Sequence, residues 1–307
     1  MKIKNTLVNF FISPIFKMVS KALWLPVVMA FSSMSVHAEL LTDSILIEGH
    51  FRVFHFVKPE IAAKNQSLLF ILHGSGGNGV GIRKGAIHFE SVAQHEGALI
   101  VYPDGYKKYW NECRKSATSE ANLEDINDPA FFQSMIAYFT NRHSVNPKRV
   151  FVIGTSGGGH MAYKLAMLMP ESITAISALI ANLPTKENMD CAPKQKAIPV
   201  MIVNGTKDEI NPYEGGEVKI AQVKLGFVQS TQKTFQYWSK LNGYKGNPVV
   251  ELLPDVDPGD GKRIERYTYK KNNRHEVTLY KVIGGKHDYP NDIDVYAESW
   301  SFFKRQL

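Results

Sequence analysis

One stretch of the chain, residues 150–170, constrains the fold more than any other. It opens with a β-branched and aromatic run, Val150 to Ile153, which predicts a buried strand. Apolar residues then recur at helical spacing from Met161 to Met169. Between the two lies Gly154-Thr155-Ser156-Gly157-Gly158, a G-x-S-x-G pattern that predicts a tight strand-to-helix turn with an exposed serine. The glycines are expected because a Cβ there would collide with the neighbouring strand and helix. The alternative interpretation is a glycine-rich turn that happens to contain serine.

Strand-like and helix-like segments alternate along residues 44–304. This alternation predicts an α/β fold, with a mainly parallel central sheet flanked by helices, in one domain over residues 39–307. The expected strands are Ile45–Ile47, Arg52–Val57, Ser67–Leu72, Ala98–Tyr102, Val150–Ile153, Ala175–Ala181, Pro199–Val203, Val249–Leu253, Ile264–Tyr269 and Val277–Ile283. The expected helices are Ile82–His95, one that starts at Asp128 as N-cap with Pro129 at N1, one after Ser156, Thr231–Leu241 and Asp294–Lys304.

Residues 1–38 differ in kind from the rest. Four lysines precede the apolar stretch Ala22–Phe31, and Val36-His37-Ala38 resembles a signal-peptidase site, so we expect a signal peptide cleaved after Ala38. The alternatives are a membrane anchor or a buried first helix, but Pro26 and the short apolar run argue against a stable span. We therefore predict a secreted or periplasmic protein without stable membrane insertion after cleavage.

Charge and cysteine content narrow the class further. The formal charge of +7 includes four lysines in residues 1–38 and no acid there, which leaves 7 − 4 = +3 for the mature chain. A weakly basic chain predicts no nucleic-acid partner. Cys113 and Cys191 are the two cysteines, and in an exported protein we expect them to form a disulfide rather than remain free thiols. Two cysteines do not make a zinc site, so no metal is expected.

A serine hydroxyl needs a base and an orienting acid before it can act as a nucleophile. On this fold the order along the chain is serine, acid, histidine, each on a loop that follows a strand. His287 follows Val277–Ile283 and meets this requirement, and Asp208 follows Pro199–Val203, with Glu209 as the next choice of acid. The expected triad is therefore Ser156, Asp208 and His287.

The reaction also needs backbone donors for the negative oxygen that develops on the carbonyl. Gly157, directly after the serine, is one expected donor. The loop after Ser67–Leu72 contains His73-Gly74-Ser75-Gly76-Gly77, and we choose Ser75 over Gly76 as the second donor. His73 precedes the serine, so we expect it to brace this loop rather than act as the base.

A series of short motifs runs through the mature chain in a fixed order. They are Leu72-His73-Gly74-Ser75-Gly76-Gly77, Val101-Tyr102-Pro103-Asp104-Gly105, Trp110-Asn111, the Ser156 turn, Gly205-Thr206-Lys207-Asp208, Pro212-Tyr213-Glu214-Gly215-Gly216 and Gly284-Gly285-Lys286-His287. With them the chain resembles the secreted polyhydroxybutyrate depolymerases and the feruloyl or acetyl-xylan esterases, on the α/β-hydrolase fold. The resemblance implies the same Ser156, Asp208 and His287. Members commonly have Cys where Ser75 stands and Asn where Gly157 stands. The resemblance therefore implies the catalytic chemistry but not the substrate.

Several aromatic side chains are candidates to line the substrate groove. We expect Trp110, Tyr213 and Tyr289 to touch substrate, with Tyr106 and Tyr109 as further candidates. The leading interpretation is a serine carboxylesterase of the polyhydroxybutyrate depolymerase type, acting through an acyl-enzyme without a cofactor. The expected substrate is a hydroxyalkanoate oligomer or an aromatic or acetyl ester. The alternatives are a feruloyl or acetyl-xylan esterase, a peptidase of the prolyl-oligopeptidase kind, and a non-catalytic binding protein that kept the fold.

Overall fold

The computed structural model describes residues 39–59, 65–220 and 223–307. The predicted signal peptide, residues 1–38, lies outside the described residues. Within the described ranges, no helix is both long enough and apolar enough to cross a membrane.

A ten-stranded sheet runs through the described part of the chain in the order β1-β2-β4-β3-β5-β6-β7-β12-β11-β10. The six central strands are parallel to one another; they are β4, β3, β5, β6, β7 and β12. The outer strands β1 and β2 at one edge, and β11 and β10 at the other, pair antiparallel. The bounds are β1 Leu41–Ile47, β2 His50–Val57, β3 Gln66–Leu72, β4 Ala98–Pro103, β5 Val145–Thr155, β6 Ala175–Leu179, β7 Val200–Gly205, β10 Val249–Leu252, β11 Arg263–Tyr269 and β12 Val277–Ile283. The fold class predicted from the sequence is confirmed.

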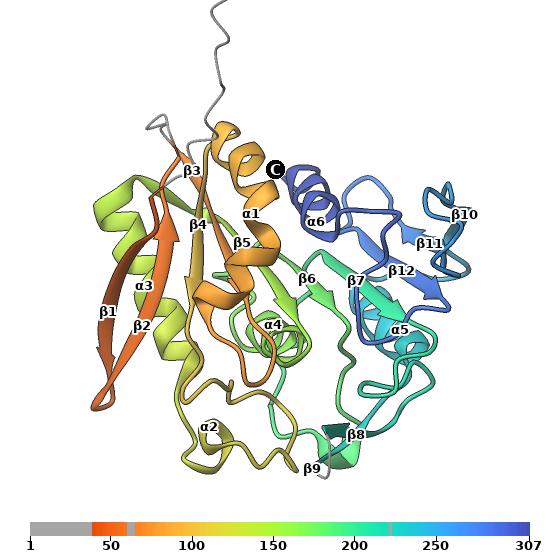
Figure 1. The fold of residues 1–307 in the computed structure, drawn as a ribbon, viewed down its shortest axis with the longest axis horizontal. Helices are drawn as coiled ribbons and strands as arrows, with labels where there is room; N and C mark the ends of the chain where they lie inside the picture. Colours follow the sequence, from red (N-terminus) through yellow and green to blue (C-terminus); the bar gives the residue numbers. More distant parts are fainter. Residues whose placement is uncertain (1–38, 60–64, 221–222) are drawn as a thin grey trace, which may run out of the picture. The chain divides into compact units, whose positions relative to one another are not determined.

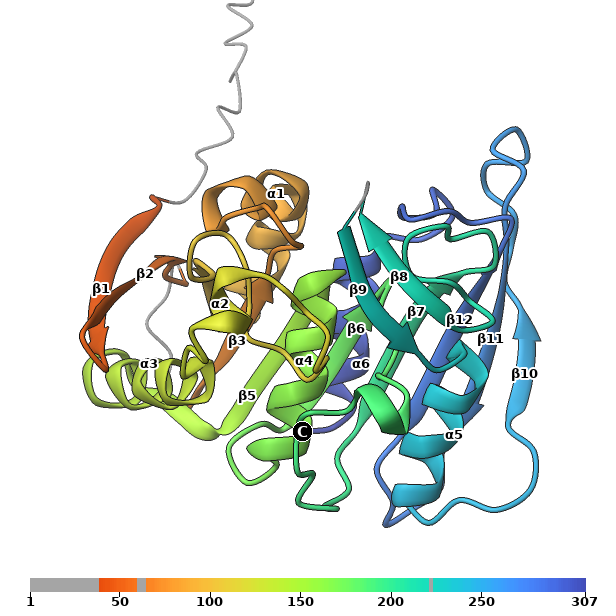
Figure 2. The same ribbon diagram turned by 90° about the horizontal axis from the view of Figure 1, so that it is seen from below.

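Helices cover both faces of this sheet (Figure 1). Buried side chains of α3, α4 and α5 pack on one face, and those of α1 and α6 pack on the other. Figure 2 shows the same layers from below, with the separate hairpin β8–β9 in front of the main sheet. The bounds are α1 Gly79–His95, α2 Glu120–Leu123, α3 Asp128–His143, α4 Gly157–Leu168, α5 Thr231–Leu241, α6 Val295–Lys304, β8 Gly216–Ile220 and β9 Val223–Val228, with a 3₁₀ turn at Lys186–Asn188.

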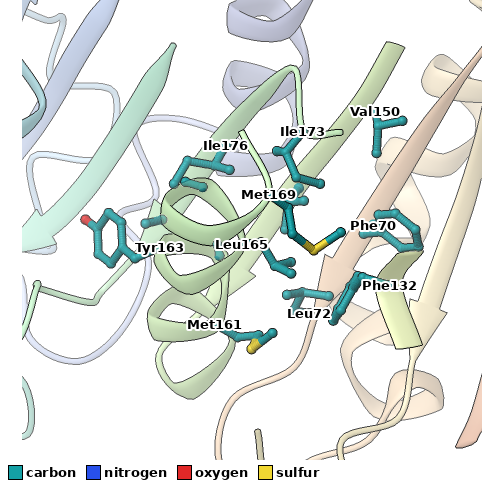
Figure 3. Packing of buried hydrophobic residues seen from close by; sticks show 14 of the residues in the cluster. Phe70, Leu72, Phe132, Val150, Met161, Tyr163, Leu165, Met169, Ile173 and Ile176 are labelled. Carbon is teal, nitrogen blue, oxygen red and sulfur yellow. The ribbon is translucent and has the colours of Figure 1, made fainter. Parts of the chain in front are cut away.

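Successive side chains of a strand point to opposite faces of the sheet, so β3 packs against the helices on both faces. Phe70 and Leu72 point to the α4 side, whereas Leu69 and Ile71 point to the α1 side, and all four are fully buried. Figure 3 shows the α4 side, where the helical spacing from Met161 to Met169 brings apolar side chains against this face of the sheet. A strand buried on both faces reads as a near-continuous apolar run, as Leu68–Leu72 of β3 does.

The parallel arrangement positions the site. The strands β5, β6, β7 and β12 are consecutive neighbours and run in the same direction. Their carboxyl ends therefore meet at one edge of the sheet, where the segments that follow them come together. Ser156, Asp208 and His287 follow β5, β7 and β12 respectively.

One local prediction is wrong, and two elements of the structure were not predicted. Helix α3 has Asn127 as its N-cap, and its side chain accepts a hydrogen bond from the N–H of Ala130, so the predicted Asp128 cap is wrong. Asp128 is instead buried beside Arg52, at 2.6 Å. The sequence analysis also missed α2 and the β8–β9 hairpin, although the alternation in Glu217-Val218-Lys219-Ile220 is a strand signal.

Phe132 connects the core to the loop that carries Trp110. Its ring is fully buried and lies 5.2 Å from the Phe70 ring and 5.9 Å from the Trp110 ring, centroid to centroid. We expect Phe132→Ala to lower the free energy of unfolding by about 3–5 kcal/mol, because the cavity left behind adds to the lost burial. Urea denaturation measures this loss, and Phe51→Ala, at a residue 74% exposed, is the matched control. Equal losses in the two variants would contradict this account of the core.

Candidate active site

Ser156 stands at the junction between β5 and α4 in a conformation that L-residues rarely adopt. Its φ and ψ are 53° and −115°, and such strain costs on the order of 1–3 kcal/mol. The turn is held by the N–H of Ser156, which donates to the carbonyl of Leu179 at 2.9 Å. It is also so crowded that a Cβ on Gly158 would lie 2.5 Å from the carbonyl oxygen of Leu72. The backbone therefore holds the serine at the end of the strand.

The structure brings Ser156, His287 and Asp208 into one hydrogen-bonded chain. His287 Nε2 lies 2.9 Å from Ser156 Oγ, and His287 Nδ1 lies 2.8 Å from Asp208 Oδ2. A carboxylate accepts the Nδ1–H, so Nε2 is left to accept the serine proton, which is the tautomer that a general base requires.

Asp208 is itself oriented by the backbone. Its other oxygen, Oδ1, accepts the N–H groups of Ile210 at 2.9 Å and Asn211 at 2.8 Å. Its side chain is 1% exposed. Glu209, the other candidate acid, is exposed, and Asp288 pairs with Lys262 instead. Only Asp208 of these three carboxylates bonds to His287.

The loop after β3 lies against the serine. A Cβ on Gly157 would lie 2.6 Å from Ser75 Oγ and 3.0 Å from the Ser75 nitrogen, so the backbones of the two proposed donors are adjacent. The N–H of Gly76 is occupied, because it donates to the carbonyl of Lys108 at 2.9 Å. No backbone acceptor for the Ser75 N–H is found among the residues that the structure describes. This geometry supports the choice of Ser75 over Gly76.

His73 holds this loop from behind. Its Nε2 accepts the N–H of Gly105 at 2.9 Å, so the proton sits on Nδ1, which donates to the carbonyl of Gly74 at 2.7 Å. The indole N–H of Trp110 donates to the His73 carbonyl at 2.9 Å. Burial lowers the pKa of His73, which favours the neutral ring that these bonds need.

A cavity of about 250 Å³ opens beside Ser75 and Gly157. Trp110 and Tyr109 lie in its wall, as does the pair Glu112 and Arg114. The remaining lining residues are Ala117, Thr118, Ser119, Glu120, Asn122, Ile220 and Leu225. A substrate group placed here lies directly beside the two proposed oxyanion donors.

The other predicted aromatic contacts lie elsewhere. The hydroxyl of Tyr289 bonds to Thr155 Oγ1, and its ring packs on Tyr296, so it supports the strand behind the serine. Tyr213 is buried outside the cavity lining, and burial raises its pKa. Tyr106 bonds to Glu124 at the surface. Trp110 and Tyr109 are the members of the predicted aromatic set that line the cavity.

Glu112, Arg114, Ile220 and Leu225 are lining residues that the sequence analysis missed. The charged pair flanks Cys113, but nothing in the sequence distinguishes it from a solvated pair. Burial raises the pKa of Glu112, while the positive charge of Arg114 opposes this shift. Ile220 and Leu225 come from the β8–β9 hairpin, and the strand alternation there was the signal that could have found them.

The disulfide predicted between Cys113 and Cys191 is present. It joins the loop that carries Glu112 and Arg114 to the segment after the 3₁₀ turn. Arg114 also pairs with Met189 in an isolated bridge. One wall of the cavity is therefore held by a covalent link.

Comparison with known proteins gives a consistent result. A model of the phospholipase/carboxylesterase family matches residues 55–238. Feruloyl esterase B of Piromyces equi is 28% identical over 205 residues, covering 64% of this chain and 35% of that protein. The bifunctional acetylxylan esterase/xylanase XynS20E of Neocallimastix patriciarum is 26% identical over 256 residues, covering 83% of this chain and 33% of that protein. The chain thus spans about a third of the length of these two relatives.

A solved structure, the acetyl xylan esterase from Aspergillus awamori, aligns with a TM-score of 0.58 and 16% identity. The alignment covers 86% of this chain and 99% of that one. At this identity the likeness shows a shared fold.

The disulfide yields a testable expectation. It closes a loop with a sequence separation of 78, so its loss through Cys113→Ser with Cys191→Ser should lower the free energy of unfolding by roughly 4 kcal/mol. Urea denaturation of the variant and of wild type under non-reducing conditions measures this loss. An unchanged free energy of unfolding would contradict the stabilising role of the disulfide.

His160 on α4 gives a pH-dependent expectation. Burial lowers its pKa well below the ordinary value near 6.5, and the charge of Arg114 acts in the same direction. Below pH 6.5 the unfolded chain therefore binds a proton that the folded chain does not. This contribution to the free energy of unfolding is fully present above pH 6.5 and is lost as the pH falls, by up to about 1.4 kcal/mol per pH unit.

The difference between wild type and His160→Met isolates this group. The difference in the free energy of unfolding between the two proteins, measured by urea denaturation, should change between pH 7.5 and pH 5. The wild type should lose more stability than the variant as the pH falls. Replacement of the exposed His88 by Met is the control. Parallel curves for wild type and His160→Met would refute the expectation.

Proposed function

This chain belongs to the phospholipase/carboxylesterase family and has the α/β-hydrolase fold. We propose that it is a serine hydrolase that cleaves carboxylic esters of the feruloyl or acetylxylan type. The observation that carries the proposal is the cavity beside Ser75 and Gly157, which has Trp110 in its wall and is large enough for one ring. The relatives support this alternative better than the polyhydroxybutyrate interpretation that the sequence analysis placed first.

The proposed reaction uses each element of the geometry. His287 Nε2 takes the proton of Ser156 as its Oγ attacks the ester carbonyl, and Asp208 stabilises the imidazolium that forms. The N–H groups of Ser75 and Gly157 donate to the oxyanion of the tetrahedral intermediate, at a point where preorganised donors are worth several kcal/mol. His287 then gives its proton to the departing alcohol oxygen, which leaves an acyl group on Ser156.

The second half repeats the first with water. His287 Nε2 removes a proton from water, the resulting hydroxide attacks the acyl carbon, and Ser156 leaves with the proton returned by His287. The acid is released and the enzyme is restored. We also propose that the protein acts after export, which the predicted signal peptide and the Cys113–Cys191 disulfide support.

Substitution of the nucleophile tests the chemistry. We expect Ser156→Ala to reduce kcat for p-nitrophenyl acetate and methyl ferulate by roughly 10⁴-fold or more, because the covalent route is lost. Ser44→Ala, at an exposed serine on β1, is the matched control and should hydrolyse both esters like wild type. Turnover by Ser156→Ala equal to that of the control would refute the assignment.

A side-by-side panel tests the substrate class. We compare kcat/KM for methyl ferulate, acetylated xylo-oligosaccharides and a hydroxybutyrate trimer, measured by acid release. We expect kcat/KM to be higher for methyl ferulate or for the acetylated xylo-oligosaccharides than for the trimer. A clear preference for the trimer would return the polyhydroxybutyrate interpretation to first place.

A further inference from the structure

Two charged side chains line a cavity that also has apolar and aromatic lining residues. Glu112 and Arg114 both line the cavity and are only 3% and 4% exposed. Burying charged groups costs several kcal/mol per ion unless their partners compensate it fully. The fold therefore carries a desolvated ion pair at the place where the substrate is proposed to bind, and its hydrogen bonds show what it can still do.

The two groups are bonded to each other in a way that leaves the arginine unsatisfied. Arg114 Nε donates to Glu112 Oε1 at 2.8 Å, and the Arg114 backbone N–H donates to Glu112 Oε2 at 3.0 Å. Arg114 Nη1 is buried and has no hydrogen-bond partner among the described residues. A guanidinium has five N–H donors, and the two on Nη1 are unused within the described ranges.

The other buried arginine of this kind is compensated differently. Arg52 pairs with Asp128, and its Nη1 also has no hydrogen-bond partner within the described ranges. Its guanidinium, however, lies over the ring of Phe131, 4.5 Å from the centroid. Cation–π contact of this kind replaces part of the lost solvation. For Arg114 no such ring contact is found among the described residues, and its side chain lines the cavity.

The charge balance decides which ligand Arg114 suits. A lone arginine prefers a carboxylate, which it binds through two parallel hydrogen bonds. Here the Glu112 carboxylate neutralises the guanidinium, and Glu120 adds a second carboxylate to the lining. Lys164 donates its Nζ to the carbonyl of Asn111, and Lys107 Nζ lies 3.9 Å from Glu120 Oε1; neither lysine lines the cavity. An anionic ligand would therefore meet two carboxylates, whereas a neutral hydroxyl can accept from Arg114 and donate to Glu112.

The apolar part of the lining indicates the body of the ligand. Trp110, Tyr109, Ile220 and Leu225 line the same cavity as the charged pair. Apolar and aromatic lining residues cover the face of a ring, while polar lining groups meet its substituents. A flat or nearly flat ring with at least one hydroxyl suits both kinds of lining residue.

We propose that Arg114, neutralised by Glu112, is the specificity-determining residue of this esterase. It selects esters whose cavity-bound part is a neutral hydroxylated ring, a phenol or a sugar, over the same ester without the hydroxyl or with a carboxylate in its place. This inference rests on the proposed ester hydrolysis and deepens it.

Two matched ester series test the selection on either side of the ester bond. The acid series contains methyl 3-phenylpropanoate and its 4-hydroxy and 4-carboxy derivatives. The alcohol series contains 2-phenylethyl acetate and its 4-hydroxy and 4-carboxy derivatives. In at least one series, wild type should show a kcat/KM for the hydroxylated ester roughly 10-fold or more above both others, the size expected for hydrogen bonds to a charged group.

Three variants assign this preference to the pair. Arg114→Met should abolish the preference for the hydroxyl. Glu112→Gln removes the neutralising charge and should raise the relative kcat/KM of the 4-carboxy ester, an effect that a merely structural role would not produce. The double variant Glu112→Gln with Arg114→Met leaves no buried unpaired charge and should also lack the preference, so a folding defect in Arg114→Met alone does not decide the outcome.

A distant ion pair gives the control. Arg305, directly after α6, has its Nη2 2.8 Å from Oε1 of Glu276, directly before β12. Neither residue lines the cavity. Arg305→Met should keep the wild-type selectivity. A preference that persists in the double variant, or the absence of any preference in both wild-type series, would overturn the inference.

The failure of this inference can be told from the failure of the proposed function. If wild type hydrolyses p-nitrophenyl acetate in a Ser156-dependent manner but shows no preference in either series, ester hydrolysis stands and the role of Arg114 falls. If p-nitrophenyl acetate and both series remain uncleaved, the proposed function itself fails, and the inference falls with it.

Discussion

The whole site depends on how closely the first turn of α4 approaches the end of β3. In this chain a Cβ on Gly158 would lie 2.5 Å from the Leu72 carbonyl oxygen, and a Cβ on Gly157 would lie 2.6 Å from Ser75 Oγ. Backbones can approach this closely only where side chains are absent. The approach places the serine, the first N–H of α4 and the loop after β3 within one small space, and the strained conformation of Ser156 is the local cost.

The loop between β4 and α3 completes the site from the other direction. Asp128 accepts the backbone N–H of Asn111 at 2.7 Å, and Lys164 on α4 donates to the Asn111 carbonyl at 2.7 Å. The disulfide holds the next part of the loop at Cys113. A loop without regular structure near Trp110 is thus tied to α3, to α4 and to a distant segment, which gives the cavity wall a defined position beside the oxyanion donors.

Sequence reasoning went furthest where one physical rule acts along the chain. The apolar run Leu68–Leu72 predicted a strand buried on both faces, and the helical spacing of apolar residues in α4 predicted its buried face. The order of Ser156, Asp208 and His287 placed them after parallel strands, whose ends share one edge. Reasoning failed at α3, where Asn127 rather than Asp128 caps the helix. Both residue types can cap, and the buried partner Arg52 that engages Asp128 lies 76 residues away in the sequence.

By itself, therefore, the sequence determined the α/β fold, the strand-to-helix turn at Ser156 and the candidates for its partners, since these follow from local conformation and chain order. The tertiary structure decided what surrounds them. It turned Tyr289 behind the strand, placed Trp110 in the cavity and buried Glu112 with Arg114 beside it. Such choices depend on which long-range neighbours exclude water from a side chain, and burial of a charged residue leaves no pattern in the sequence around it.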